Sequence, residues 1–331
     1  MRRLISSILG LGLVAAVQAA EPPTLTVYTY SSFTAEWGPG PAIEQAFEAQ
    51  CQCNLQFVAL DDGVALLSRV KLEGKASKAD VVLGLDTNLL AEAANSGLFA
   101  PHGLELTGLS LPIAWSDPLF VPFDYGWFAF VYDREALPNP PRSLKELVYA
   151  SDARLLIEDP RTSTPGLGLL LWMRQVFGDQ TAAAWSKLKP RIVTVSPGWS
   201  EAYGLFLKGE APLVLSYTTS PAYHIINDKT ERYAAAAFSE GHYLQVEVAA
   251  KLAAARQPEL ADQFLRFIIS EGFQSQIPTG NWMYPVITLK NGLPPAFAAL
   301  PQPERSLLFP ADDLMQQRKT WVNEWLQALG R

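Results

Sequence analysis

The sequence predicts an α/β fold in which two units, each a parallel sheet covered by helices, are joined by an extended crossing strand. Strand-like and helix-like segments alternate from residue 24 onward, an order typical of parallel sheets. A second alternation begins near residue 143. Between them, six of the ten residues 123–132 are aromatic and nothing interrupts an extended chain, which suits a strand that crosses between units. The alternative is a single domain in which this segment is one buried strand.

The first unit is expected to contain three strands and two helices. Residues 24–30 alternate β-branched and aromatic side chains, as a half-buried strand does. Residues 79–85 are more continuously apolar, which indicates a strand buried on both faces. Gly74 ends the second helix. In chain order the expected elements are strand 24–30, helix 42–50, strand 55–60, helix 64–73 and strand 79–85.

The second unit opens with Ser143 and Glu146, which have the spacing of a helix-capping box. The elements expected after this helix start are strand 155–158, helix 168–177, strand 192–195, helix 200–208, strand 213–217, strand 244–250, helix 258–270 and helix 310–329. A second crossing between the units is expected near residues 238–244. No internal repeat is present.

The N-terminal segment has the pattern of a cleavable signal peptide over residues 1–19. Arg2 and Arg3 precede the apolar run 4–14, and small residues around Ala19 suit cleavage. The chain has 331 residues with 26 basic and 33 acidic side chains, so losing the two arginines changes the net charge from −7 to −9. An acidic chain without a basic stripe disfavours nucleic-acid binding. The sequence therefore predicts an exported protein of two domains.

Cysteine and histidine are scarce. The two cysteines, Cys51 and Cys53, and three histidines do not have the spacing of a zinc site, so no metal is expected. In an oxidising compartment the cysteines either close a short disulfide or remain two free thiols, and the sequence leaves both open. A redox-active role is disfavoured because the Cys-x-x-Cys pattern is absent.

Polar and aromatic residues gather where the predicted strands end, which is where open parallel sheets bind ligands. Aromatic faces attract a flat organic cation, and a carboxylate adds Coulomb attraction. The helix start at Ser163 and Thr164 suits an anionic phosphate. We therefore expect a ligand with a cationic aromatic ring and, optionally, phosphate. Other interpretations remain: Asp62 as a helix cap, Asp86 as a solvated loop acid, and residues 163–166 as a plain turn.

Several blocks of the sequence closely resemble one known family, the periplasmic thiamine-binding proteins. The blocks are LTVYTY (25–30), DGVALL (62–67), FDYGWFAFVYD (123–133), DPRTSTPGLGLLLWM (159–173), GWSEAYGLFLKGE (198–210), SYTTSPAYH (216–224), FSEGHYLQVEVAA (238–250) and IPTGNWMYP (277–285). The stretch after Val286 is the least distinctive. This resemblance implies a type II periplasmic binding protein, with two α/β lobes joined by two crossover strands and the ligand in the cleft.

The resemblance also implies a function and a set of ligand contacts. The protein would capture thiamine, and with it thiamine monophosphate and pyrophosphate, and deliver it to an ABC importer made of a membrane permease and a cytoplasmic ATPase. It would be a monomer without cofactor or catalytic activity. The implied ligand-binding residues are Asp62, Gly63, Ser163, Thr164, Trp199, Tyr217, Thr218, Thr219 and Ser220, with aromatic positions Tyr30, Tyr223 and Trp282.

The lobes are expected at residues 24–120 plus 245–285 for lobe 1 and at 121–244 for lobe 2, with the helical segment 286–331 packing on lobe 2. The nearest alternative is a binding protein of the same fold for another organic cation such as a polyamine. A ferric-ion binder is disfavoured because no Tyr-Tyr pair is present. A secreted hydrolase is disfavoured because neighbouring Asp61 and Asp62 would point to opposite sides and no Gly-x-Ser-x-Gly pattern occurs.

Overall fold

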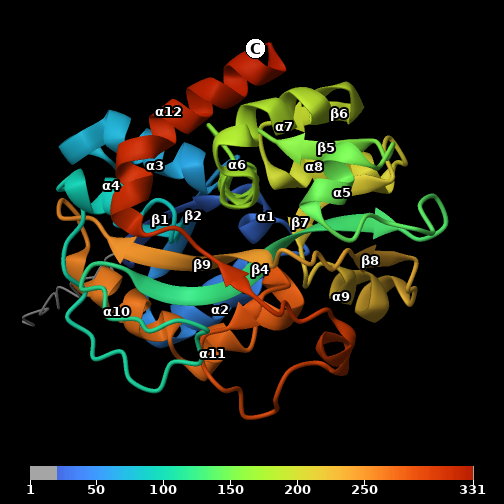
Figure 1. Ribbon diagram of the computed structural model, residues 1–331. Helices are drawn as coiled ribbons and strands as arrows, with labels where there is room; N and C mark the ends of the chain where they lie inside the picture. The colour runs from blue at the N-terminus through green and yellow to red at the C-terminus, as the bar shows by residue number, and fades with distance from the viewer. Residues whose placement is uncertain (1–20, 331) are drawn as a thin grey trace, which may run out of the picture.

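Residues 21–330 of the protein are described by a computed structural model (Figure 1). The expected signal peptide at residues 1–19 lies outside the described residues. Strands and helices alternate along the chain, and the helices pack on the faces of a long curled sheet. No helix within residues 21–330 combines the length and the apolar character needed to cross a membrane.

The strands of this part of the chain form one sheet whose main path runs β2-β1-β3-β9-β4-β7-β5-β6. Short strands pair with the two central ones, β8 and β10 with β4 and β11 with β9. The strand bounds are β1 (Thr24–Tyr30), β2 (Asn54–Leu60), β3 (Val81–Asp86), β4 (Val121–Asp133), β5 (Leu155–Glu158), β6 (Ile192–Ser196), β7 (Leu213–Tyr217), β8 (Tyr233–Ala235), β9 (His242–Lys251), β10 (Tyr284–Pro285) and β11 (Ser306–Leu307).

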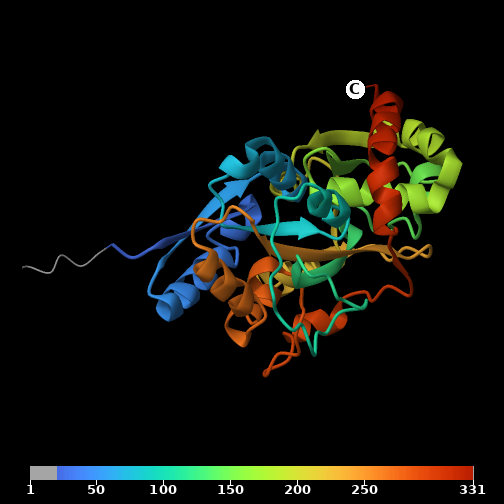
Figure 2. The same ribbon diagram turned by 90° about the vertical axis from the view of Figure 1, so that its left-hand side faces the viewer.

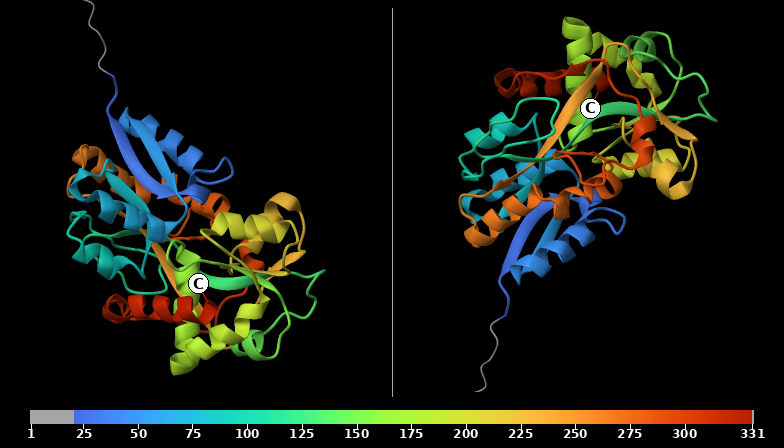
Figure 3. Two further views of the ribbon diagram at one scale, coloured as in Figure 1. Left: turned by 90° about the horizontal axis from the view of Figure 1, so that it is seen from above. Right: turned by 90° about the horizontal axis from the view of Figure 1, so that it is seen from below.

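The outer strands are parallel and the two central ones are not. β1 pairs in parallel with β2 and β3, and β5 pairs in parallel with β6 and β7, as the alternating sequence predicts. β4 and β9 run antiparallel to each other and to their neighbours β7 and β3. They extend through the middle of the molecule, between the blue β1 and β2 at one end and the green and yellow elements at the other (Figures 1 and 3).

The second crossing begins at His242, inside the range 238–244 near which the sequence placed it, but not at Phe238. Phe238 and Gly241 close a turn in which the Gly241 N–H donates to the Phe238 carbonyl at 3.1 Å. Gly241 has a φ of +96°, a region that side chains rarely adopt. The extended chain therefore starts only at His242 and continues to Lys251 as β9.

Three helices, α3, α5 and α6, start directly after residues whose side chains cap them. Asp62, Ser143 and Ser163 each accept a hydrogen bond from a backbone N–H in the first turn of the helix that follows. The helix bounds are α1 (Ser31–Thr34), α2 (Gly40–Cys51), α3 (Gly63–Glu73), α4 (Leu90–Asn95), α5 (Leu144–Tyr149), α6 (Thr164–Phe177), α7 (Thr181–Leu188), α8 (Trp199–Leu207), α9 (Pro221–Tyr223), α10 (Pro258–Ile268), α11 (Glu271–Gln274) and α12 (Ala311–Leu329), with π-helical turns η4 (His224–Asp228) and η5 (Ile277–Asn281).

The last helix, α12, lies across the outside of the molecule (Figures 1 and 2). It contacts α7 and α6, and it also reaches α4. The ring of Trp325 is buried and meets Trp185 of α7 edge-on, with the ring centroids 6.4 Å apart. The apolar stripe of this helix thus joins the core instead of facing water.

Cys51 and Cys53 are joined in a disulfide, which resolves the choice that the sequence left open. The bridge lies at the end of α2, directly before β2. Neither cysteine therefore has a free thiol in this structure.

Two glycines within helices provide a matched test of the packing. A Cβ at Gly168 of α6 would come 2.0 Å from the Phe128 ring, whereas a Cβ at Gly204 of α8 would meet nothing within 4 Å. Gly168→Ala is expected to lower the free energy of unfolding by about 1–3 kcal/mol through overpacking. Gly204→Ala is expected to leave it unchanged or raise it by up to about 1 kcal/mol through helix propensity. Urea unfolding of both variants measures this, and equal effects would contradict the packing at Gly168.

Candidate functional site

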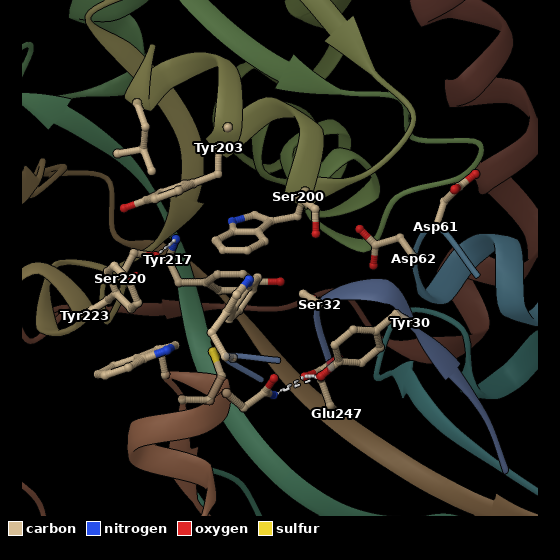
Figure 4. Close-up of a pocket in the computed structure, with 17 residues that line it drawn as sticks. Tyr30, Ser32, Asp61, Asp62, Ser200, Tyr203, Tyr217, Ser220, Tyr223 and Glu247 are labelled. Carbon is tan, nitrogen blue, oxygen red and sulfur yellow. Dashed lines mark hydrogen bonds between the residues drawn. The ribbon is translucent and has the colours of Figure 1, made fainter. Parts of the chain in front are cut away.

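A cavity of about 260 Å³ lies where β1, β2, β7 and β9 meet the start of α8 (Figure 4). Segments from both halves of the sheet contribute to it, so residues far apart in the chain face one space. The residues that line it are Tyr30, Ser32, Trp37, Asp61, Asp62, Trp199, Ser200, Tyr203, Gly204, Leu207, Tyr217, Ser220, Tyr223, Glu247, Asn281, Trp282 and Met283.

Aromatic rings form much of the wall. Trp199 stacks on Tyr203 with the ring centroids 4.8 Å apart and the planes 24° apart, and Trp37 approaches Trp199 at 6.1 Å. Tyr223 meets Trp282 nearly perpendicularly at 5.2 Å. Exposed ring faces of this kind carry negative quadrupole charge and attract a flat cation.

Hydrogen bonds fix the indole of Trp199. Its Nε1 donates to Ser216 Oγ at 2.7 Å, and Ser216 Oγ lies 2.7 Å from Ser220 Oγ. The hydroxyl of Tyr203, whose ring stacks on the indole, lies 2.9 Å from His224 Nε2. His224 Nδ1 in turn lies 2.7 Å from the Asp228 carboxylate. Both rings are thus held in place before any ligand arrives, which lowers the entropy lost on binding.

The carboxyl of Asp62 joins the starts of two helices, α3 and α6, beside the cavity. Its Oδ1 accepts from the Gly63 N–H at 2.8 Å, and its Oδ2 accepts from the Ser163 hydroxyl at 2.9 Å. A backbone bond from the Ala65 N–H to the Thr162 carbonyl, at 3.0 Å, lies beside them. Burial raises the pKa of Asp62, and the hydrogen bonds that it accepts oppose this shift. In Figure 4 the Asp62 carboxyl points toward the cavity and that of Asp61 points away.

A polar cluster forms the floor. The Tyr30 hydroxyl donates to Glu247 Oε2 at 3.0 Å, and the Asn281 amide donates to the Tyr30 oxygen at 2.9 Å (Figure 4). The same amide donates to Asp124 Oδ2 at 2.5 Å. Burial raises the pKa of Tyr30 well above its ordinary value, so its hydroxyl keeps its proton.

Comparison with known proteins identifies the family. Residues 34–275 match the family described as "Bacterial extracellular solute-binding protein". The chain belongs to this family. Two relatives, from Salmonella typhimurium and Escherichia coli K12, are each called "Thiamine-binding periplasmic protein". They are 58% and 57% identical to this solute-binding protein over 329 residues, which is 99% of this chain and 100% of each relative.

A solved structure titled "Periplasmic thiamin binding protein" is 59% identical, with a TM-score of 0.92, and the match covers 94% of this chain and 97% of that one. The resemblance to the periplasmic thiamine-binding proteins, drawn from the sequence blocks, is thereby confirmed. The type II fold, with two α/β lobes joined by the crossover strands β4 and β9, is confirmed as well.

The cavity brings together most of the side chains that the sequence singled out. Those lining it are Tyr30, Asp62, Trp199, Tyr217, Ser220, Tyr223 and Trp282. Gly63, Ser163, Thr164, Thr218 and Thr219 are all buried and lie outside the lining. Ser163 instead caps α6 and supports Asp62. The role of each of these residues in binding stays a prediction.

Several lining residues were not anticipated from the sequence. Tyr203 and Leu207 follow Trp199 at helical spacing, so recognising helix α8 as a cavity wall would have found them. Glu247 lies inside an apolar strand, where a lone acid is itself a signal. Asp86, expected in solvent, is fully buried and accepts from the Asn88 amide at 2.7 Å. Burial raises its pKa to about 7, and the hydrogen bond from Asn88 and the charge of Arg318 oppose this shift.

The charged side chains that line the cavity are all acidic: Asp61, Asp62 and Glu247. Within residues 21–330, no cluster of histidine, cysteine or acidic side chains is arranged to hold a metal ion. Aromatic faces combined with carboxylates suit the non-covalent binding of an organic cation by this solute-binding protein.

The buried acids predict an unusual pH dependence of stability. Burial raises the pKa of Asp86 and Asp124 to about 7 and that of Glu158 well above its ordinary value. The folded state therefore holds protons that the unfolded state has already released, so stability falls as pH rises through these values. For each group the slope is about 1.4 kcal/mol per pH unit between its ordinary pKa and its raised pKa, and it fades above the raised value. The thermal midpoint of the ligand-free protein should fall between about pH 6.5 and about pH 8.

His224 and His242 have lowered pKa values because of burial, so they oppose this trend only below their ordinary value of 6.5. Glu158→Gln should flatten the slope, because this side chain is 1% exposed and neither carboxyl oxygen has a hydrogen-bond partner. Glu135→Gln, at a side chain that is 72% exposed, is the matched control. A thermal midpoint that rises toward pH 8 would contradict the prediction.

Proposed function

We propose that this solute-binding protein captures thiamine in the periplasm for delivery to an ABC importer. The observation that carries the proposal is the cavity itself, in which aromatic faces stand beside carboxylates and no basic side chain lines the space. Thiamine offers a positively charged thiazolium, an aminopyrimidine and a hydroxyethyl arm. The relatives named as thiamine-binding match essentially the whole chain, which supports the same ligand here.

The proposed contacts use the walls of the cavity. Rings on opposite sides of the cavity would hold the heterocycles by stacking and by cation–π attraction, each contact contributing about 0.5–2 kcal/mol. Asp62 would bond the aminopyrimidine or compensate the thiazolium charge. The rings assigned to this role are Tyr30, Trp199, Tyr217, Tyr223 and Trp282.

Phosphate esters of thiamine are proposed as further ligands. The polar residues assigned to the hydroxyl or phosphate are Ser163, Thr164, Thr218, Thr219 and Ser220. The hydroxyl of Thr218 is buried without a hydrogen-bond partner, so it has a donor free for a phosphate oxygen. Ser220 lines the cavity, whereas the other four residues lie outside the lining, so a movement of the two lobes relative to each other would have to bring them to the ligand.

The remaining expectations concern the cellular setting. The relatives are called periplasmic, which supports export through the signal peptide at residues 1–19 and a location in the periplasm. We propose a monomer that meets a membrane permease with a cytoplasmic ATPase. Residues 24–120 and 245–285 would form lobe 1 and residues 121–244 lobe 2. Residues 286–331 would pack on lobe 2, which the contacts of α12 to α7 and α6 support, although α12 also contacts α4 of lobe 1.

We propose binding without chemical conversion. Both cysteines are tied up in the disulfide beyond the end of α2, and neither lines the cavity, so no thiol is available there as a nucleophile. A polyamine is the second candidate ligand, because the acidic lining would also attract a flexible cation.

Titration calorimetry with thiamine, its two phosphate esters and spermidine tests the proposal. Trp199→Ala should weaken thiamine binding by at least about 1 kcal/mol, because it removes a ring face and the hydrogen bond to Ser216. Tyr149→Ala, at a side chain that is 54% exposed and outside the cavity, should leave the affinity unchanged. Preference for spermidine over thiamine would favour the alternative, and heat from neither would reject both.

A further inference from the structure

Two buried carboxyl groups face each other on the crossover strands. Asp124 of β4 and Glu247 of β9 are direct partners in the antiparallel register, next to a bulge between Pro122 and Asp124. Asp124 is fully buried and Glu247 is 5% exposed. Glu247 lines the cavity, whereas Asp124 lies behind it. An acidic pair is thus built into the two strands that connect the lobes.

The surroundings of this pair contain acids and phenols. The titratable groups facing Glu247 are Tyr30 from β1, Asp62 from the start of α3, Asp124 from β4 and Tyr217 from β7. Asp86 of β3 is its register partner on the other side. The neutral amide of Asn281 donates to Asp124 at 2.5 Å and approaches Glu247 Oε2 at 3.4 Å.

The charge of the pair is therefore compensated by a proton. Burial raises the pKa of Asp124 to about 7 and that of Glu247 well above its ordinary value, and the neighbouring Asp124 raises the pKa of Glu247 further. Near neutral pH the ligand-free pair keeps at least one proton, which the Glu247 carboxyl holds against Asp124. A positive charge in the cavity would lower the pKa of the Glu247 carboxyl, as a neighbouring basic side chain does, and so favour loss of this proton.

We propose that Glu247, backed by Asp124, is a second specificity-determining contact for the positive charge of the ligand and releases its proton to solvent when the cation binds. The only bond that breaks is the carboxyl O–H, and the cavity then holds one more negative charge against the incoming positive one. This inference rests on the proposed function, because it takes a cationic heterocycle as the ligand. It adds a role that stacking alone does not supply: Glu247 distinguishes a charged ligand from an uncharged ligand of the same shape.

The test begins with the unaltered protein. Calorimetric titration of thiamine near pH 7, in buffers that differ in ionisation enthalpy, gives the number of protons released on binding. We expect release of about half to one proton, and affinity that rises up to about tenfold per pH unit in this range. Binding with no proton release would overturn the inference and leave the proposed function standing. Absence of any thiamine binding would instead reject the proposed function.

Two variants and an uncharged ligand then assign the effect to Glu247. The ligand is the thiophene analogue of thiamine, in which carbon replaces the charged nitrogen. Glu247→Gln should abolish the proton release and weaken thiamine binding about tenfold, with less than about twofold change for the analogue. Glu231→Gln, at a side chain that is 77% exposed, should retain the release. Equal loss for both ligands would indicate a merely structural role and overturn the proposal.

The same measurement on Asp124→Asn guards against a folding defect in the first variant. Its amide can still accept a hydrogen bond from Glu247, so Glu247 should keep its proton more weakly and the release should shift to lower pH. Circular dichroism at each pH verifies that both variants are folded. Unchanged proton release in the folded Asp124→Asn protein would contradict the pairing.

Discussion

The antiparallel pairing of β4 with β9 is the constraint on which the rest of the structure depends. Parallel strands at either end of the sheet are held in one molecule because these two strands continue between them. β4 runs for thirteen residues, and nearly all of them are buried. The same two strands carry Asp124, Gln245 and Glu247, so the element that connects the lobes also forms the floor of the cavity. The same two strands thus contact the ligand site and set how the two lobes lie relative to each other.

A second feature follows from the sign of the charges in the cleft. Buried carboxyl groups without bases are costly when ionised, and they persist in a folded protein only if another group or a proton compensates them. Asp62 uses hydrogen bonds from Gly63 and Ser163, while Asp124 and Glu247 share a proton and an amide. An organic cation stacked between the rings would compensate these carboxylates by direct Coulomb attraction, in place of the hydrogen bonds at Asp62 and of the shared proton at Asp124 and Glu247. The acidic groups of the cavity therefore favour a positively charged ligand already in the unbound protein.

Much of the fold could be predicted from the sequence because it depends on local patterns. Strands such as 24–30 and helix caps such as Ser143 are determined by residues that are neighbours in the sequence. The site was predicted in part, because strand ends in a parallel sheet converge, and this placed Tyr30, Asp62 and Tyr217 correctly around one space. The burial of Ser163 and Thr164 depends on how α3 meets α6. The pairing of Asp124 with Glu247 depends on the register of two strands, in which these residues are 123 positions apart in the chain. No local pattern carries that information.

The contact of Trp37 with Trp199 has a practical consequence. Trp37 belongs to the turn between α1 and α2, is 46% exposed, and lies 6.1 Å from an indole that begins α8, on the other side of the cavity mouth. Indole fluorescence responds to the polarity of its surroundings. Trp37 and Trp199 therefore provide an intrinsic fluorescence signal at the place where the two halves touch. Separation of the two halves in solution should therefore shift the wavelength of the tryptophan fluorescence, without any attached dye.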